Sequence, residues 1–265
     1  MRIIQSTLFV IVLLLFGTGI TSFKSDAQEN DIFNISINPE ANEAFLLAVY
    51  TLYIPPNVKE LKGIIVHQHG CGRNGLSIVY DFHWRALAIK NNYALMGTHY
   101  LVSNSCENWS DPKAGSGRAF LSALDEFAVS SGHPELSDVP WALWGHSGGA
   151  RWSCRMLEEY PERIVGVYAR SLALPYSDDA LKVPVIISMG RGEQNHPVFN
   201  AVWEQCNAAF SKIRKENGLA ALVVDPITAH DCGKSRFLAI PFLDAYRRAS
   251  GSMFPLYTGY SDPKK

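Results

Sequence analysis

Short apolar runs alternate with longer amphipathic segments along most of the chain. Six runs have the length and the β-branched or aromatic content of buried strands, and they lie at residues 63–68, 93–98, 141–145, 164–170, 183–189 and 222–225. The segment 44–54 also contains β-forming residues and stops at Pro55 and Pro56, which predicts one or two antiparallel strands. Residues 28–40 are polar, and we expect them to be irregular.

Between these runs lie segments whose apolar residues recur at helical spacing. In one of them Phe120, Leu124 and Phe127 fall on a single face. Such segments predict helices at residues 77–91, 115–131, 148–160, 197–217 and 236–249. Strands that alternate with helices are typical of βαβ units. The sequence therefore predicts an α/β fold with a mostly parallel, twisted sheet covered by helices on both faces.

The N-terminal segment has a different character. Arg2 precedes an uninterrupted apolar run at residues 8–16, and a pattern of small residues ends at Ala27. This is the layout of a secretory signal peptide, and the run is too short to cross a bilayer as a helix. We expect a signal peptide at residues 1–27, one domain at residues 28–265, and export to the periplasm or cell exterior without a stable membrane anchor. An uncleaved N-terminal anchor is the alternative.

Composition and charge narrow the function classes. The chain has 265 residues, 47% of them hydrophobic, with 24 basic and 25 acidic side chains. This balance is typical of a globular protein and gives no electrostatic basis for binding nucleic acid. The five cysteines are an odd number and too few for a disulfide framework. They allow one or two local disulfides, without deciding the pairing, among Cys71, Cys106, Cys154, Cys206 and Cys232.

A G-x-S-x-G motif carries the main chemical prediction. The run at residues 141–145 leads into Gly-His-Ser-Gly-Gly at residues 145–149, and a predicted helix follows. In this motif the serine occupies a tight turn from strand to helix, where larger side chains two positions away would collide. The start of the helix also offers backbone N–H groups to a developing oxyanion. We interpret Ser147 as a nucleophile; a glycine-rich turn with a capping serine is the structural alternative.

A nucleophilic serine needs a general base. In a parallel-sheet hydrolase the base follows the serine along the chain, after the last strand. His146 lies within the turn itself, and His196 precedes a proline and fits a simple loop. His230 follows the last predicted strand and precedes the last predicted helix, which makes it the candidate base.

The carboxylate that orients the base is expected after the second-to-last predicted strand. Glu193 is the first carboxylate after the run at residues 183–189 and is the candidate acid. Asp178 and Asp179, one strand earlier, and Asp225, at the end of the last strand, are its rivals.

A second oxyanion donor is expected in the loop after the first buried run. The loop reads His69-Gly70-Cys71-Gly72, and its glycines would let the backbone approach a ligand closely. We expect the N–H of Cys71, or of a flanking glycine, to donate to the oxyanion together with the N–H of Gly148.

Ser147, Glu193, His230 and the His-Gly loop together resemble the α/β-hydrolase superfamily in residue type and chain order. Within it, the chain is similar to secreted single-domain esterases related to dienelactone hydrolases, feruloyl esterases and polyester depolymerases. It departs from tannase-type feruloyl esterases, which have cysteines directly before the serine and directly after the histidine; His146 and Asp231 stand there in this chain. The resemblance implies the α/β-hydrolase fold and a serine esterase activity.

Two other patterns compete with this interpretation. Gly70, Gly72 and Gly75 match the spacing of a dinucleotide-binding turn, but no carboxylate ends the next strand. His67 and His69 are possible metal ligands, but no third ligand has a suitable spacing. We therefore expect no cofactor and no bound metal.

The tryptophans divide into two groups. Trp141, Trp144 and Trp152 lie in or beside the strand and helix of the serine motif, where core packing is expected. Trp109 lies in a polar loop and is the candidate substrate-facing aromatic.

The chain leaves little room for a lid. About a dozen residues separate the runs at residues 164–170 and 183–189, where hydrolases often insert one. An open site suits a carboxylic ester that is a small molecule or is linked to a bulky polymer such as a polysaccharide. A serine esterase is therefore the expected function; a serine peptidase or amidase of the same fold, and a catalytically silent glycan-binding protein, are the alternatives.

Overall fold

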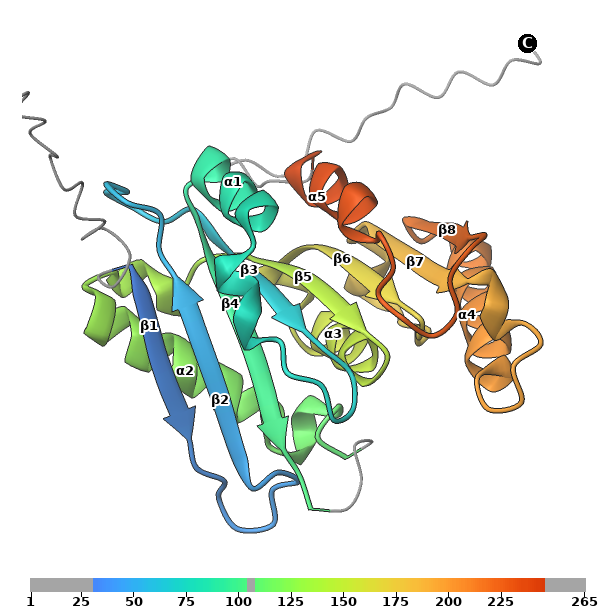
Figure 1. Ribbon diagram of the computed structural model, residues 1–265, viewed down its shortest axis with the longest axis horizontal. Helices are drawn as coiled ribbons and strands as arrows, with labels where there is room; N and C mark the ends of the chain where they lie inside the picture. The colour runs from blue at the N-terminus through green and yellow to red at the C-terminus, as the bar shows by residue number, and fades with distance from the viewer. Residues whose placement is uncertain (1–30, 104–107, 246–265) are drawn as a thin grey trace, which may run out of the picture.

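The computed structural model describes residues 31–103 and 108–245. Its centre is a sheet of eight strands in the spatial order β1-β2-β4-β3-β5-β6-β7-β8 (Figure 1). The strands are β1 (Ile32–Ile37), β2 (Leu47–Tyr53), β3 (Gly63–Gln68), β4 (Tyr93–Leu101), β5 (Trp141–His146), β6 (Ile164–Arg170), β7 (Val185–Gly190) and β8 (Ala220–Asp225). The predicted signal peptide at residues 1–27 lies outside the described residues.

The sheet is mostly parallel, as the sequence predicts. β2 pairs antiparallel with both β1 and β4, whereas every pairing from β4 to β8 is parallel. The carboxyl ends of these parallel strands therefore meet at one edge of the sheet. The segments that follow β3, β5, β7 and β8, which carry the candidate residues, all start at this edge.

Helices cover both faces of the sheet. One hydrophobic cluster contains residues of α2 (Ser116–Ser131), α3 (Gly148–Glu159) and α4 (Asn200–Lys215), and a second contains residues of α1 (Phe82–Asn91) and α5 (Arg236–Ala245). β5 alternates between the two: Trp141 and Leu143 join the first cluster, Ala142 and Trp144 the second. Trp141, Trp144 and Trp152 are all buried in the core, which confirms the prediction for them.

The expectation of irregular structure at residues 28–40 is wrong. β1 lies in this segment, pairs antiparallel with β2 and is an outermost strand of the sheet. Phe33, Ile35 and Ile37 pack against the core, and Asn34 and Ser36 alternate with them. A half-buried edge strand has a period of two, which the average polarity of the segment conceals.

The predicted helix at residues 77–91 is divided in two. A short 3-10 helix at Leu76–Tyr80 precedes α1. Asp81 separates them because its Oδ1 accepts hydrogen bonds from the backbone N–H groups of His83 at 2.9 Å and Trp84 at 3.2 Å. This carboxylate caps the first turn of α1 and starts a new helix.

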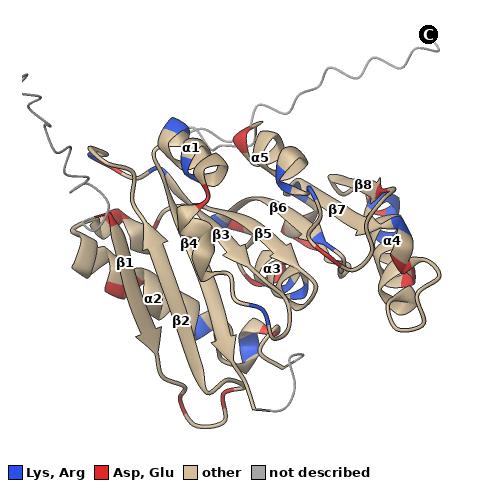
Figure 2. Ribbon diagram, viewed as in Figure 1, with Lys and Arg blue, Asp and Glu red and all other residues tan. Residues whose placement is uncertain are grey.

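No large lid lies between β6 and β7. Residues 171–184 connect them and contain one short 3-10 helix at Asp178–Lys182, as the short spacing predicts. Lys, Arg, Asp and Glu are intermixed over the outer helices and loops (Figure 2). Among the described residues, no helix combines the length and the apolar character needed to cross a membrane.

Candidate active site

Ser147 occupies the turn between β5 and α3 in a strained backbone conformation. Its φ is +54° and its ψ −120°, a region that residues with a side chain rarely adopt. The backbone N–H of Ser147 donates to the carbonyl of Arg170 at 2.8 Å, and the Ser147 carbonyl accepts from the N–H of Arg151 at 3.0 Å. These bonds hold the turn on the sheet and at the first turn of α3.

The glycines around Ser147 are required by close backbone contacts. A Cβ at Gly145 would overlap the backbone of Gly149, and a Cβ at Gly149 would overlap the carbonyl of Gln68. A Cβ at Gly70, on the loop after β3, would lie 2.7 Å from the Cβ of Ser147. The absence of side chains therefore lets the loop after β3 reach the serine, as the motif predicts.

Ser147, His230 and Glu193 form a continuous hydrogen-bonded chain. Nε2 of His230 is 2.9 Å from Oγ of Ser147, and Nδ1 of His230 is 2.6 Å from Oε1 of Glu193. Because a carboxylate only accepts hydrogen bonds, Nδ1 is the nitrogen that donates to Glu193. Nε2 then accepts from the Ser147 hydroxyl. This tautomer can take a proton from the serine.

Glu193 is fully buried in the 3-10 helix that follows β7. Its Oε2 accepts a hydrogen bond from the backbone N–H of Gly190 at 3.1 Å, so both carboxylate oxygens have a partner. The rivals do not reach His230: Asp178 and Asp179 lie in the 3-10 helix before β7, and Asp225 accepts from the N–H of Ile227. Of these four candidate carboxylates, Glu193 is the one that the structure brings to His230.

A buried arginine holds the loop that carries His230. Arg170, the last residue of β6, is 1% exposed. Its Nε donates to the carbonyl of Asp231 at 2.8 Å, and its Nη2 donates to Oγ1 of Thr228 at 2.7 Å and to the carbonyl of Ala229 at 3.3 Å. The guanidinium thus binds the loop on both sides of His230. Sequence reasoning missed this role, because β6 carries no motif.

We expect the substitution Arg170→Met to displace His230. It leaves the partly buried carbonyls of Asp231 and Ala229 without this donor, which should lower the free energy of unfolding by about 3 kcal/mol. A displacement of His230 by about 1 Å should lower kcat by about 100-fold. Thermal unfolding and steady-state kinetics on an aryl ester measure the two effects.

Arg163→Met is the matched control for this substitution. Arg163 also donates to two backbone carbonyls, those of Ser137 and Val139, but it lies at the opposite edge of the sheet, before β6. Its replacement should lower stability and leave kcat unchanged. Equal losses of kcat in the two variants would contradict a positioning role for Arg170.

Cys71 and Gly148 lie next to each other at the candidate oxyanion site. A Cβ at Gly148 would lie 3.1 Å from Sγ and 3.7 Å from the backbone nitrogen of Cys71. Cys71 is disulfide-bonded, whereas Cys154, Cys206 and Cys232 have free thiols; Cys106 lies outside the described residues. A disulfide at Cys71 restrains the loop whose N–H was expected to face the substrate.

A cavity of about 790 Å³ adjoins Ser147 and His230. The loop before α4 and the start of that helix supply apolar lining residues, among them Val198 and Val202, and Arg73 and Arg151 supply positive charge. No carboxylate is among the described lining residues. The cavity can accommodate an acyl or alcohol group much larger than acetate.

The expectation that Trp109 faces the substrate is wrong. Trp109 is 2% exposed and stacks on Tyr100 with ring centroids 5.1 Å apart. Its Cζ2 would lie 3.4 Å from a Cβ at Gly148, so the ring packs beneath the candidate oxyanion site. A polar sequence neighbourhood did not indicate burial, because Tyr100 comes from β4.

Phe199, which sequence reasoning did not single out, is the aromatic ring that contacts His230. The two rings stack with centroids 3.8 Å apart and planes 5° apart. His196 holds this loop, since its Nδ1 accepts from the backbone N–H groups of Val198 at 3.1 Å and Phe199 at 3.2 Å. The loop role considered for His196 from the sequence is the one that the structure supports.

Packing explains residues of both competing patterns, the metal pattern and the nucleotide pattern. His67 is buried and stacks on Trp144 with centroids 3.7 Å apart, and burial lowers its pKa well below the usual range. His67 and His69 by themselves do not form a metal site. Gly75 packs against the carbonyls of His67 and Thr98, which explains this glycine of the G-x-G-x-x-G spacing by packing.

Comparisons with known proteins identify the fold. No protein-family model and no curated protein matches the chain. Among solved structures, a ferulic acid esterase matches with a TM-score of 0.62 at 12% identity, over 81% of this chain and 98% of that one. A poly(3-hydroxybutyrate) depolymerase from Bordetella parapertussis matches with a TM-score of 0.55 at 18% identity, over 83% and 91% of the two chains.

A third solved structure, poly(aspartic acid) hydrolase-1 from Sphingomonas sp. KT-1, matches with a TM-score of 0.54 at 17% identity, over 78% of this chain and 97% of that one. At such low identities the likeness concerns the fold. The protein has the α/β-hydrolase fold, which confirms the fold that the sequence motifs imply.

Proposed function

We propose that the protein is a serine hydrolase that cleaves carboxylic esters through an acyl-enzyme. The observation that carries this proposal is the chain of hydrogen bonds from Ser147 through His230 to Glu193, with distances of 2.9 Å and 2.6 Å, at the wall of a cavity. A strained serine between required glycines supports it, because strain at a turn of this kind exposes a nucleophile.

Each residue then has a defined step in the reaction. Nε2 of His230 takes the hydroxyl proton as Oγ of Ser147 attacks the ester carbonyl carbon. Backbone N–H groups of Gly148 and Cys71 stabilise the oxyanion, and Glu193 stabilises the imidazolium through Nδ1. His230 next protonates the leaving alcohol. It finally deprotonates a water molecule, which attacks the acyl-enzyme, and returns this proton to Oγ of Ser147 as the acid leaves.

The cavity and the short β6–β7 connection favour a large substrate. The described residues contain no lid over this edge between residues 171 and 184, and the cavity is lined by both apolar and cationic side chains. We therefore propose a bulky or polymer-linked ester, such as one carried on a polysaccharide. The solved structures of the same fold include esterases and polymer hydrolases, which supports this substrate class.

The proposed export remains a prediction from residues 1–27. The disulfide at Cys71 supports it, because disulfides persist in oxidising compartments.

Covalent labelling tests the proposed function. A fluorophosphonate should react with the protein, with loss of fluoride, and mass spectrometry should locate the phosphonyl group on Ser147. The labelled protein should then fail to hydrolyse esters. A folded protein that does not react would favour the glycan-binding alternative.

A substrate panel then defines the reaction. Acetyl, feruloyl, uronoyl and aliphatic polyester substrates should include at least one that is hydrolysed, and the matched amides should react more slowly. Faster cleavage of the amides would favour the peptidase or amidase alternative. Strong activity restricted to long-chain triglycerides would contradict the proposed substrate class.

A further inference from the structure

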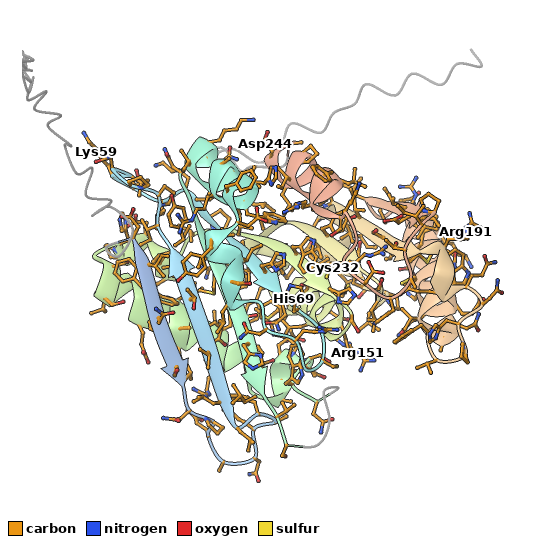
Figure 3. The ribbon with its side chains drawn as sticks, in the orientation of Figure 1. Lys59, His69, Arg151, Arg191, Cys232 and Asp244 are labelled. Carbon is orange, nitrogen blue, oxygen red and sulfur yellow. The ribbon has the colours of Figure 1, made fainter. Side chains whose placement is uncertain are left out.

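Three potential metal ligands that are far apart in the sequence meet beside the candidate active site. They are His69 from the loop after β3, His146 from the end of β5, and Cys232 from the loop that also carries His230. Each offers one ligand atom, and these atoms all lie within 4.8 Å of one another. Nδ1 of His69 is 3.8 Å from Sγ of Cys232, and Figure 3 shows the two labelled side chains together in the middle of the molecule.

His146 is the member of this cluster that ordinary packing does not explain. It is 7% exposed, and both of its ring nitrogens are buried without a hydrogen-bond partner among the described residues. A buried imidazole that makes no hydrogen bond is costly. A metal ion bound to one of its nitrogens would remove part of that cost.

A neutral imidazole can bind a metal ion directly, whereas a thiol must first lose its proton. Burial lowers the pKa of His146 to about 3 and also lowers the pKa of His69. Both imidazoles are therefore neutral near pH 7 and have a lone pair available. Burial raises the pKa of the Cys232 thiol to about 11, so an incoming cation must displace the thiol proton, which leaves to solvent.

We propose that His69, His146 and Cys232 bind one Zn²⁺ ion. Two ligand atoms at 2.0–2.3 Å from a tetrahedral zinc ion are about 3.5 Å apart, close to the 3.8 Å between Nδ1 of His69 and Sγ of Cys232. Two imidazoles and a thiolate favour zinc over magnesium or calcium, which prefer oxygen ligands. His146 also lines the active-site cavity, which provides an entry path and space for water as the fourth ligand.

A cation at this site would act on the proposed reaction. The His146 ring lies 5.2 Å from the His230 ring between centroids. Two positive charges on zinc and one negative charge on the thiolate leave a net positive charge beside His230. Because His230 must become an imidazolium during the reaction, this charge should slow hydrolysis. This consequence rests on the proposed function, whereas metal binding itself does not.

The site also joins three segments of the chain. The loop after β3, the serine turn and the His230 loop each contribute one ligand. A ligand that binds the folded state and not the unfolded state stabilises the folded state. Zinc should therefore raise Tm while it lowers the hydrolysis rate.

Zinc titration of the chelator-treated protein tests the proposal. In competition with a chromogenic chelator, one Zn²⁺ per chain should bind, raise Tm and protect Cys232 from maleimide. The other free thiols among the described residues, on Cys154 and Cys206, are buried, so Cys232 should be the thiol among them that maleimide labels in the folded protein.

Ligand variants identify the site. Changes in the second shell of metal sites lower affinity by about 10–100-fold, so Cys232→Ser, which removes a ligand, should weaken zinc binding by about 100-fold or more. His69→Gln serves as the second variant if Cys232→Ser fails to fold. His133→Gln is the matched control, since His133 pairs with Glu135 far from this cluster; it should bind zinc as the unmodified protein does.

The possible outcomes separate the proposals. Unchanged zinc affinity in Cys232→Ser and His69→Gln, or no zinc binding at all, would overturn the site. Binding that leaves ester hydrolysis unaffected would overturn the inhibitory role. If the metal-free protein hydrolyses no ester but zinc still binds, raises Tm and protects Cys232, the proposed function fails and the metal site stands.

Discussion

Replacing Ser147 by alanine should lower kcat on an activated aryl ester by at least about 10⁴-fold, the scale of loss when the nucleophile of a serine hydrolase is removed. The variant lacks the atom that His230 deprotonates, so no acyl-enzyme forms. Stopped-flow measurement should show that the initial burst of alcohol release, if present in the unmodified protein, is absent. The cavity and the oxyanion donors remain, so KM should change little.

The chain contains a matched control for this substitution. Ser171 also has a φ of +54°, but it is fully buried and lies directly after β6 rather than in the hydrogen-bonded chain. Ser171→Ala should keep the activity of the unmodified protein. Substantial turnover by Ser147→Ala would contradict the proposed nucleophile, and equal losses in both variants would point to backbone strain instead.

Replacing Glu193 by glutamine should lower kcat by about 10³–10⁴-fold, as loss of the acid does in other hydrogen-bonded triads. Both oxygens of Glu193 now accept hydrogen bonds, from the N–H of Gly190 and from Nδ1 of His230. Glutamine has one oxygen and one NH₂ group. If its oxygen faces Gly190, its NH₂ group faces His230, and Nδ1 must then accept. The proton moves to Nε2, which can no longer take the Ser147 proton.

This loss should appear in kcat and leave KM nearly unchanged, because the tautomer of His230 matters only for chemistry. Glu204→Gln is the matched control: it makes the same substitution at an exposed position of α4 and should behave as the unmodified protein. An active Glu193→Gln variant with unaltered kcat would remove Glu193 from the proposed mechanism.

Local patterns predicted most of the fold. The runs at residues 63–68 and 164–170 coincide with β3 and β6, because a strand buried on both faces is a continuous apolar run whatever its neighbours. β1 was not predicted, since it is an edge strand in which the polar side chains of Asn34 and Ser36 alternate with apolar ones. The ends of α1 depended on Asp81, whose capping bonds are visible only once the helix has formed.

In the candidate site, too, some residues were predicted from the sequence and others were not. Ser147, Glu193 and His230 were chosen from their order along the chain, since consecutive parallel strands bring their carboxyl ends to one edge. Arg170 and Phe199 were not, because their contacts with the His230 loop join residues 31 or more positions apart in the sequence and carry no local pattern. Trp109 was misjudged for the same reason: its partner Tyr100 belongs to a different element.

By itself, the sequence determined most of the segments that form strands and helices and which residues follow the carboxyl ends of the strands, because apolar periodicity and glycine turns act over a few residues. Only the tertiary structure decided which of those side chains touch. It alone shows that His69, His146 and Cys232 converge and that a buried arginine holds the His230 loop. Such contacts depend on the packing of whole elements, and that packing is set by the sheet order.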